Sequence, residues 1–266
     1  MAAIRLLTPP DLPALLHLSR SASWNQTADD WLRLLFLQPD GCFGVELNGT
    51  LAATATVVCY PPNLAWLGMV LTLPEYRGRG MARSLAEHAI TYSGRRTLRL
   101  DASDMGKPLY ESLGFVDECP VERWLRDPAP FPAVGGEHPF AYPQALDVEA
   151  FGADRSALVH QLAEAECAAL PDASFALGRS GANARYFGPC VCFEPDSARK
   201  LVEWFLARHP GEPVFWDLFP HHVHASRLAA EFGFRPVRRL SRMSLPAAAR
   251  SLPDQRIYAI AGFEYG

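Results

Sequence analysis

The chain has 266 residues, of which 49% are hydrophobic and 20% charged, and its formal net charge is −4. This length allows two modest domains, and the composition is that of a packed globular protein. The acidic balance argues against a general nucleic-acid-binding protein, which would carry a basic surplus. No apolar run reaches the roughly 18 residues of a membrane span. We therefore expect neither nucleic-acid nor membrane partners.

Six cysteines are scattered along the chain, and none forms a C-x-x-C pair. In a chain of this size we interpret them as small buried hydrophobic residues in a reducing compartment. The first sixteen residues contain three prolines and an aspartate, which argues against a signal peptide. These features predict a cytoplasmic protein.

The first elements follow from local signals. Residues 4–7 are predicted to form a strand, and the residues from Asp11 onward have the apolar spacing of a helix. Thr27 and Asp30 have the spacing of a capping box ahead of a second helix. Asn48–Gly49 separates two apolar runs, at 42–47 and 51–58, which predicts a β-hairpin with a type I′ turn.

A second group of elements completes the first half of the chain. Residues 65–73 are predicted as a strand, followed by a turn rich in arginine and glycine and by a helix to about residue 94. Residues 97–102 predict another strand, 108–114 a short helix and 116–124 a last strand. The predicted order is strand-helix-helix-strand-strand-strand-helix-strand-helix-strand.

Residues 128–143 contain five prolines and two adjacent glycines, which exclude a helix or a central strand there. We expect a linker at 128–143 between two domains, 1–127 and 144–266. The second half repeats landmarks of the first: Asp101 and Asp217 lie 116 residues apart, and Gly114 recurs as Gly233 after a further shift of three residues. These matches favour duplication of one domain. The apolar tail at 263–266 is predicted as a final strand.

The turn at residues 77–83 places three arginines and two glycines at the entrance to a helix. Unpaired N–H groups and the helix dipole make such an entrance attractive to anions, glycine lets a ligand approach the backbone, and arginine adds charged donors. These features predict a phosphate-binding turn, with a solvated basic helix start as the alternative. The Walker and G-x-G-x-x-G patterns both fail, because no lysine follows the second glycine and Arg83 stands at the third glycine's place.

The stretch VLTLPEYRGRGMA, followed about thirty residues later by LYESLGF, resembles the GNAT superfamily of N-acetyltransferases. Arg77, Gly80 and Ala82 match its pyrophosphate loop, and Tyr110 and Gly114 match its later motif. The resemblance implies an α/β (α+β) fold with a mixed, mostly antiparallel sheet in each domain, flanked by helices, with a splayed central strand pair. Through GPCVCFEPDSARKL and EFGFRPVRRLSRM, the C-terminal half resembles the degenerate second domain of tandem-GNAT proteins.

The resemblance also implies a reaction and a site. The activity would be acetyl transfer from acetyl-coenzyme A, without a metal, to a primary amine of a small molecule or peptide that attacks directly in a ternary complex. The implied cofactor-binding residues are Val70, Leu71, Thr72, Arg77, Gly78, Arg79, Gly80, Met81, Ala82, Arg83 and Ser103. Tyr110 would be the general acid that protonates the leaving thiolate, with a buried core tyrosine as the alternative.

Other candidate site residues are less directly implied. Asp101 ends a strand near the site and is a candidate for the general base, although it could instead pair with Arg99 or cap a turn. Trp24 and Asn25, in the loop between the first two helices, are candidates to line the acceptor pocket. The alternative for Trp24 is a hydrophobic staple against the second helix.

The second half lacks the ligand chemistry of the first. By the offset of 116, the positions of 77–80 hold Phe193, Glu194, Pro195 and Asp196. Counted back from Gly233, the tyrosine position holds Ala229. Two carboxylates repel phosphate and a proline removes a donor, so we expect no cofactor in this half. The histidines of DLFPHHVH do not have the spacing of metal ligands, and we expect no metal site.

The sequence shows no clear general base for acetyl transfer, and this is compatible with a different class of function. The chain could be a non-catalytic acyl-coenzyme A sensor or regulatory protein. If it is an enzyme, its acidic balance favours cationic small amines as acceptors.

Overall fold

The computed structural model describes residues 3–134, 139–246 and 252–266. Its strands are β1 (Ile4–Leu6), β2 (Cys42–Leu47), β3 (Thr50–Tyr60), β4 (Leu64–Thr72), β5 (Thr97–Ala102), β6 (Val116–Arg126), β7 (Glu166–Ala169), β8 (Phe175–Arg179), β9 (Arg185–Val191), β10 (Val214–Leu218), β11 (Arg235–Leu245) and β12 (Ile257–Ala259). Its α-helices are α1 (Leu12–Ser21), α2 (Ala28–Leu37), α3 (Met81–Ser93), α4 (Lys107–Ser112), α5 (Gln144–Phe151), α6 (Ser156–Ala163), α7 (Pro195–Arg208) and α8 (Val223–Glu231).

The local signals of the first half are confirmed, and the element order is the predicted one. Thr27 caps α2 by accepting a hydrogen bond from the backbone N–H of Asp30, and the Asp30 carboxylate accepts one from the backbone N–H of Thr27. Asn48 and Gly49 both have positive φ, as a type I′ turn requires. None of the helices in the described segments is long and apolar enough to cross a bilayer.

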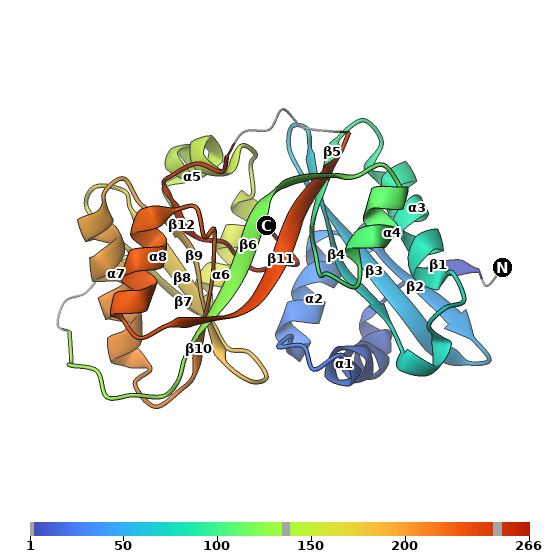
Figure 1. Cartoon of the computed structure of the whole chain (residues 1–266), viewed down its shortest axis with the longest axis horizontal. Coiled ribbons are helices and arrows are strands. Elements are labelled where there is room, and N and C mark those ends of the chain that lie inside the picture. Colours follow the sequence, from blue (N-terminus) through green and yellow to red (C-terminus); the bar gives the residue numbers. More distant parts are fainter. Residues whose placement is uncertain (1–2, 135–138, 247–251) are drawn as a thin grey trace.

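The two halves share one sheet, with strand order β1-β2-β3-β4-β5-β11-β6-β10-β9-β8-β7, and β12 pairs with β9 beside this path. Strand β11, from the second half, lies between β5 and β6 of the first. Strand β6, from the first half, lies between β10 and β11 of the second. Figure 1 shows this exchanged pair, β6 in green and β11 in red, side by side in the middle of the molecule. Each half is a continuous stretch of the chain, yet each places one strand between strands of the other half.

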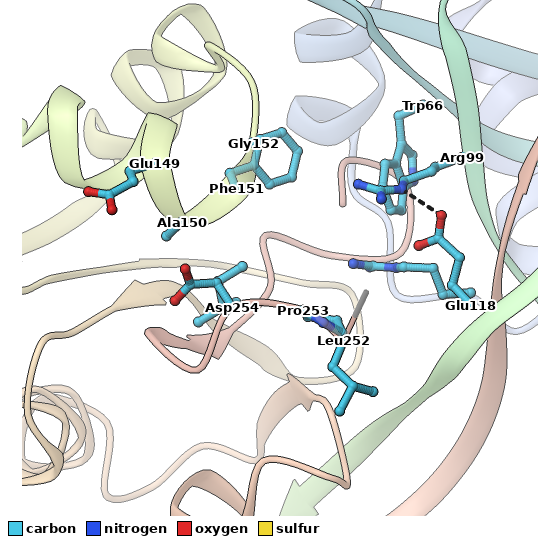
Figure 2. Close-up of a pocket in the computed structure, with 12 residues that line it drawn as sticks. Trp66, Arg99, Glu118, Glu149, Ala150, Phe151, Gly152, Leu252, Pro253 and Asp254 are labelled. Atoms are coloured by element: carbon cyan, nitrogen blue, oxygen red, sulfur yellow. Dashed lines mark hydrogen bonds and ion pairs between the residues drawn. The ribbon is translucent and has the colours of Figure 1, made fainter. Parts of the chain in front are cut away.

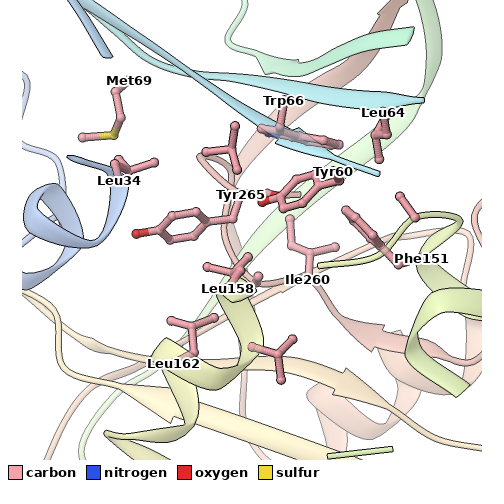
Figure 3. Packing of buried hydrophobic residues seen from close by; sticks show 14 of the residues in the cluster. Leu34, Tyr60, Leu64, Trp66, Met69, Phe151, Leu158, Leu162, Ile260 and Tyr265 are labelled. Atoms are coloured by element: carbon pink, nitrogen blue, oxygen red, sulfur yellow. The ribbon is translucent and has the colours of Figure 1, made fainter. Parts of the chain in front are cut away.

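Three hydrophobic clusters stabilise this arrangement. One packs α3 and α4 against the first half of the sheet through residues such as Leu85 and Leu100, and a second packs α7 and α8 against the second half around Trp216. The third lies between the halves and joins residues from both of them, among them Tyr60 and Leu158 (Figure 3). Burial of this central surface ties the halves together in addition to the exchanged strands.

The C-terminal tail belongs to the central cluster, and the prediction of a strand at 263–266 is wrong. The last strand ends at Ala259, and the tail then turns beneath β4, where the Trp66 indole Nε1 donates to the carbonyl of Phe263 at 2.9 Å. A Cβ on Gly68 would lie 2.8 Å from the carbonyl oxygen of Glu264, so this close approach of two backbones requires glycine.

Candidate functional site

The central feature of the first half is the divergence of β4 from β5. The strands pair in parallel only from Leu64–Thr97 to Trp66–Arg99, although both continue further. The cause is a β-bulge in β4, where Met69 and Val70 stand opposite the single residue Ala55 of β3. Met69 has a φ of 50°, and its carbonyl accepts a hydrogen bond from the Thr54 hydroxyl at 2.9 Å.

The divergence leaves a gap beside Val70, Leu71 and Thr72, the strand positions implied to bind the cofactor. Along this stretch β4 pairs with β3 on one side but no longer with β5 on the other. The hydroxyl of Thr72 is buried and has no hydrogen-bond partner among the described residues. A buried polar atom without a partner is costly, so this hydroxyl fits a polar ligand lying in the gap.

The turn that begins α3 has the geometry of an anion cradle. Gly78 and Gly80 have φ values of 74° and 79°, and a Cβ on either would meet no atom within 4 Å. Within the described part of the chain, no hydrogen bond is found from the backbone N–H groups of residues 78–83, and the first helical bond runs from Ser84 to Gly80. Met81 is buried and anchors this end of the helix in the core.

The arginines of the turn surround the exposed N–H groups. Arg77 donates through Nε to the carbonyl of Thr72 at 3.3 Å, and Arg79 lies over the ring of Tyr76. Arg83 donates to the Ser112 hydroxyl at 2.7 Å. These contacts leave further guanidinium donors beside the helix start, so the site fits a diphosphate by charge and by donor geometry. Ala82, the remaining member of the implied set, is half-buried in the same first turn.

Tyr110 and Ser103 lie on α4 and in the loop that precedes it. The Tyr110 ring is buried against Phe115 at a centroid distance of 5.7 Å, and burial raises the pKa of its phenol. No hydrogen bond of the Tyr110 hydroxyl is found among the residues that the structure describes. Ser103 accepts a hydrogen bond from the backbone N–H of Gly106 at 3.3 Å, and its hydroxyl proton remains available to a ligand.

Asp101 is not available as a base, because Arg242 of β11 occupies its carboxylate. Nε and Nη2 of Arg242 donate to the two carboxylate oxygens, each at 2.9 Å, and the Asp101 side chain has no exposed surface. Burial raises the pKa of Asp101, and the charge of Arg242 opposes this shift. The pairing with Arg99 that we considered is not formed, since Arg99 binds Glu118 instead. We do not retain Asp101 as the base.

An equivalent ion pair is found in the second half, where the aspartate belongs to the second half and the arginine to the first. Arg123 of β6 donates to both oxygens of Asp217 on β10, each at 2.7 Å. Arg123 and Arg242 lie 119 residues apart, which is also the spacing of Gly114 and Gly233. The repeat detected in the sequence therefore extends to two buried ion pairs across the exchanged strands.

The loop between α1 and α2 does not place Asn25 in a pocket. Asn25 is 2% exposed, and its amide binds the other half of the molecule. It donates to the carbonyl of Ala184 and accepts from the backbone N–H groups of Asn183 and Ala184. Trp24 packs beside the central cluster, and its carbonyl accepts a hydrogen bond from Asn183. Both residues hold the halves together, so we leave them out of the acceptor site.

In the second half, the gap corresponding to that between β4 and β5 is filled by the chain itself. Strand β12 pairs with β9 at Val191 and Cys190, and the backbone N–H of Ile260 donates to the carbonyl of Asp217 on β10 at 3.0 Å. The start of α7 carries Glu194 and Asp196 with Pro195 between them, and Ala229 is buried without a polar group. Both the gap and the anion cradle are therefore closed to a cofactor in this half.

The histidines of the DLFPHHVH stretch were also considered from the sequence as possible metal ligands. His222 caps α8 by accepting a hydrogen bond from the backbone N–H of Ala225 at 3.1 Å. Within the described ranges, no group of three or more His, Cys, Asp or Glu side chains could hold a metal ion.

A cavity of about 280 Å³ lies between the halves, near the last paired residues of β4 and β5. Figure 2 shows Arg99 and Glu118 joined by an ion pair on one side, with Glu149 and Asp254 opposite. The sequence reasoning missed Glu118, because β11 separates its strand from β5 and comes from the other half. Within its own strand, the sequence indicates only that partly exposed and buried residues alternate near Glu118.

Comparisons with known proteins place both halves in one superfamily. Residues 8–115 match the model described as "Acetyltransferase (GNAT) family", and residues 144–259 match that described as "Acetyltransferase (GNAT) domain". A Bacillus subtilis (strain 168) protein, named as the uncharacterized N-acetyltransferase YitH, is 27% identical over 241 residues, covering 83% of each chain.

Solved structures share the fold at lower sequence identity. A Pyrococcus horikoshii protein has a TM-score of 0.86 at 23% identity, covering 99% of this chain and 95% of its own. A tandem GNAT protein from the clavulanic acid biosynthesis pathway has a TM-score of 0.65 at 16% identity, covering 93% and 100%. With one GNAT model matched by each half and the same fold in a tandem-GNAT structure, the chain is an acetyltransferase of the GNAT superfamily, of the tandem type with a degenerate second domain.

Proposed function

We propose that the first half binds acetyl-coenzyme A and transfers the acetyl group to a primary amine by direct attack in a ternary complex. Members of the GNAT family use acetyl-coenzyme A. The observation that carries the proposal is the gap between β4 and β5, with the unpartnered Thr72 hydroxyl at one end and the N–H groups of 78–83 beyond it. The second half has no such opening, because β12 fills the corresponding gap.

Binding is assigned to three groups of atoms. The N–H groups of Gly78 to Arg83 and the side chains of Arg77, Arg79 and Arg83 would hold the diphosphate. The backbone of Val70, Leu71 and Thr72 would pair with the extended arm in the gap, as a neighbouring strand does. The hydroxyls of Thr72 and Ser103 would add further hydrogen bonds.

Tyr110 is assigned as the general acid. Burial raises the pKa of its phenol, so the group stays protonated throughout the neutral range and has a proton to donate. When the amine forms its bond to the acetyl carbon and the carbon–sulfur bond breaks, this proton would pass to the leaving sulfur. The hydroxyl has no competing partner among the described residues, which leaves it free for this transfer.

The test is thiol release from acetyl-coenzyme A over a panel of primary amines, with Tyr110→Phe as the variant. We expect kcat to fall about 100-fold while acetyl-coenzyme A binds as before, since general acids contribute about 10²–10⁴-fold. Tyr92→Phe is the matched control, because Tyr92 lies in the same half and receives a hydrogen bond from Gln38 on another side of the fold. Saturable cofactor binding without turnover on any amine would contradict the proposal and favour a sensor.

A further inference from the structure

The cavity between the halves has a chemistry that the proposed function does not explain. Its walls come from β4, β5 and β6 of the first half and from α5, β11 and the segment before β12 of the second. Neither half alone would enclose it. Its volume of about 280 Å³ suits a small molecule such as a single amino acid.

One wall presents charged atoms without partners. Arg99 donates to Glu118 through Nε alone, and no hydrogen bond from its two terminal nitrogens is found among the residues described. Arg242 uses Nε and Nη2 for Asp101, which leaves Nη1 without a partner in the same part of the structure. Glu118 accepts from Arg99 through Oε1, and no partner of Oε2 is found there. The wall therefore offers donors for an anion beside one acceptor for a cation or an N–H group.

On the opposite wall, one guanidinium serves two carboxylates. Arg256 forms a bidentate pair with Asp254 and a 3.1 Å ion pair with Glu149. Among the described lining residues, the guanidinium nitrogens without partners thus belong to Arg99 and Arg242 and lie on the wall of Glu118, while Phe151 and Ile257 supply apolar surface. A ligand that matched these groups would carry an anionic group, an amine and some apolar surface.

This wall lies next to the gap between β4 and β5. Trp66 and Arg99 form the last paired position before the strands diverge. Asp101, two residues further along β5, lies beside the gap and is held by the same Arg242 that lines the cavity. Along a strand, side chains two residues apart share a face, so the Arg99 and Asp101 side chains lie on the same face of β5.

We propose that the cavity is the acceptor subsite and that the acceptor is an amino-acid-like molecule with a carboxylate close to its amine. This inference rests on the proposed function. The carboxylate binds the free nitrogens of Arg99, and the amine hydrogen-bonds to Glu118. The nitrogen–carbon bond forms as the carbon–sulfur bond breaks, the amine proton passes to the Glu118 carboxylate, and the sulfur receives the proton of Tyr110.

The experiment compares acceptors that differ only in the carboxylate: phenylalanine, phenylalanine amide and phenethylamine, with leucine, leucine amide and isoamylamine as a second series. We expect kcat/KM for the amino acids to exceed that for the other two members of each series by about 10- to 100-fold, the range of a charge-assisted hydrogen bond. Arg99→Gln should remove this preference by lowering kcat/KM for the amino acids only, and Arg99→Lys should restore part of it.

Controls separate recognition from folding and proton transfer. Arg199→Gln is the matched control, since its guanidinium pairs with Glu231 outside the cavity lining, and it should leave the preference unchanged. Glu118→Gln should lower kcat about 100-fold with little change in KM. Thermal unfolding of each variant shows whether the fold is intact.

The outcomes distinguish the two proposals. Equal transfer to amines without a carboxylate, or a preference that survives Arg99→Gln, overturns the amino-acid inference and leaves the proposed function standing. If no acceptor is acetylated, calorimetry with N-acetylphenylalanine decides: binding that Arg99→Gln weakens supports the subsite while the proposed function fails, and no binding overturns the subsite too.

Discussion

The two halves differ in what lies between their central strands. In the first half, β4 and β5 diverge, and no strand of the described residues pairs between them there. In the second half, β12 pairs with β9 and the residue after it reaches β10, so the chain supplies the missing backbone partners itself. Backbone groups inside a protein need partners, and a gap between strands is satisfied by a ligand, by water or by another strand. The second half thus provides from its own chain the backbone partners that the corresponding strands need.

The N-terminal ends of α3 and α7 also differ between the two halves. The first has glycines in left-handed conformations, three arginines, and backbone N–H groups with no partner in the described part of the chain. The second has a proline between two carboxylates. In contrast, the buried ion pairs Arg242–Asp101 and Arg123–Asp217 are present in both halves. The comparison separates an architecture that both halves share from a strand gap and a helix entrance that differ between them.

The largest expected effect tests the shared part. Arg123→Ala and Arg242→Ala each leave a buried carboxylate without its partner, and we expect each to lower the free energy of unfolding by about 3–5 kcal/mol. Arg199→Ala removes an exposed bidentate pair with Glu231 and should change stability little. Chemical denaturation provides the measurement. A large loss for only one of the two buried arginines would show that the halves are not equivalent in architecture.

The next effect tests the difference between the entrances. Gly80→Asp places a side chain at a φ of 79° and a negative charge beside the cradle, so we expect acetyl-coenzyme A to bind about 100-fold more weakly. Asp196→Gly, at the corresponding position of the second half, should leave binding unchanged because β12 still fills that gap. Calorimetric titration of both variants makes the comparison. If Asp196→Gly creates a second binding site, the acidic entrance and not β12 closes the degenerate half.

The smallest effect concerns the gap itself. Thr72→Val removes a buried hydroxyl that lacks a protein partner, so we expect acetyl-coenzyme A affinity to fall by about threefold to tenfold without loss of stability in the free protein. Thr56→Val is the matched control, since the Thr56 hydroxyl on β3 is also buried without a partner among the described residues. Thermal unfolding with and without the cofactor measures both effects. Equal binding by wild type and Thr72→Val would place the cofactor elsewhere.

Local features were predictable from the sequence, and long-range partners were not. The capping box at Thr27, the Asn48–Gly49 turn and the elements of the first half depend on residues a few positions apart, so their signals survive in a single sequence. The arginine-glycine turn was likewise visible as a cluster. The offset of 116 residues between Asp101 and Asp217 pointed to a duplication, which the two GNAT matches confirm.

The predictions that the structure does not support concern residues that contact the other half. Asp101 is held by an arginine 141 residues away, and Asn25 by backbone groups 158 and 159 residues away. The apolar sequence of the tail predicts a strand. In the structure the tail forms a turn next to Trp66 and approaches Gly68 closely instead of pairing as a strand. No local pattern in the sequence encodes these contacts, because their partners lie in the other half of the chain.

The exchange of β6 and β11 makes the sheet of each half depend on the other half. Without β11, the sheet of the first half would end at β5 and leave β6 detached, with unpaired edges open to aggregation. A cut within 128–143 would accordingly give two polypeptides that remain one particle, and an isolated N-terminal fragment would lack a strand of its own sheet. The second half is thus part of the structural support of the first half's sheet.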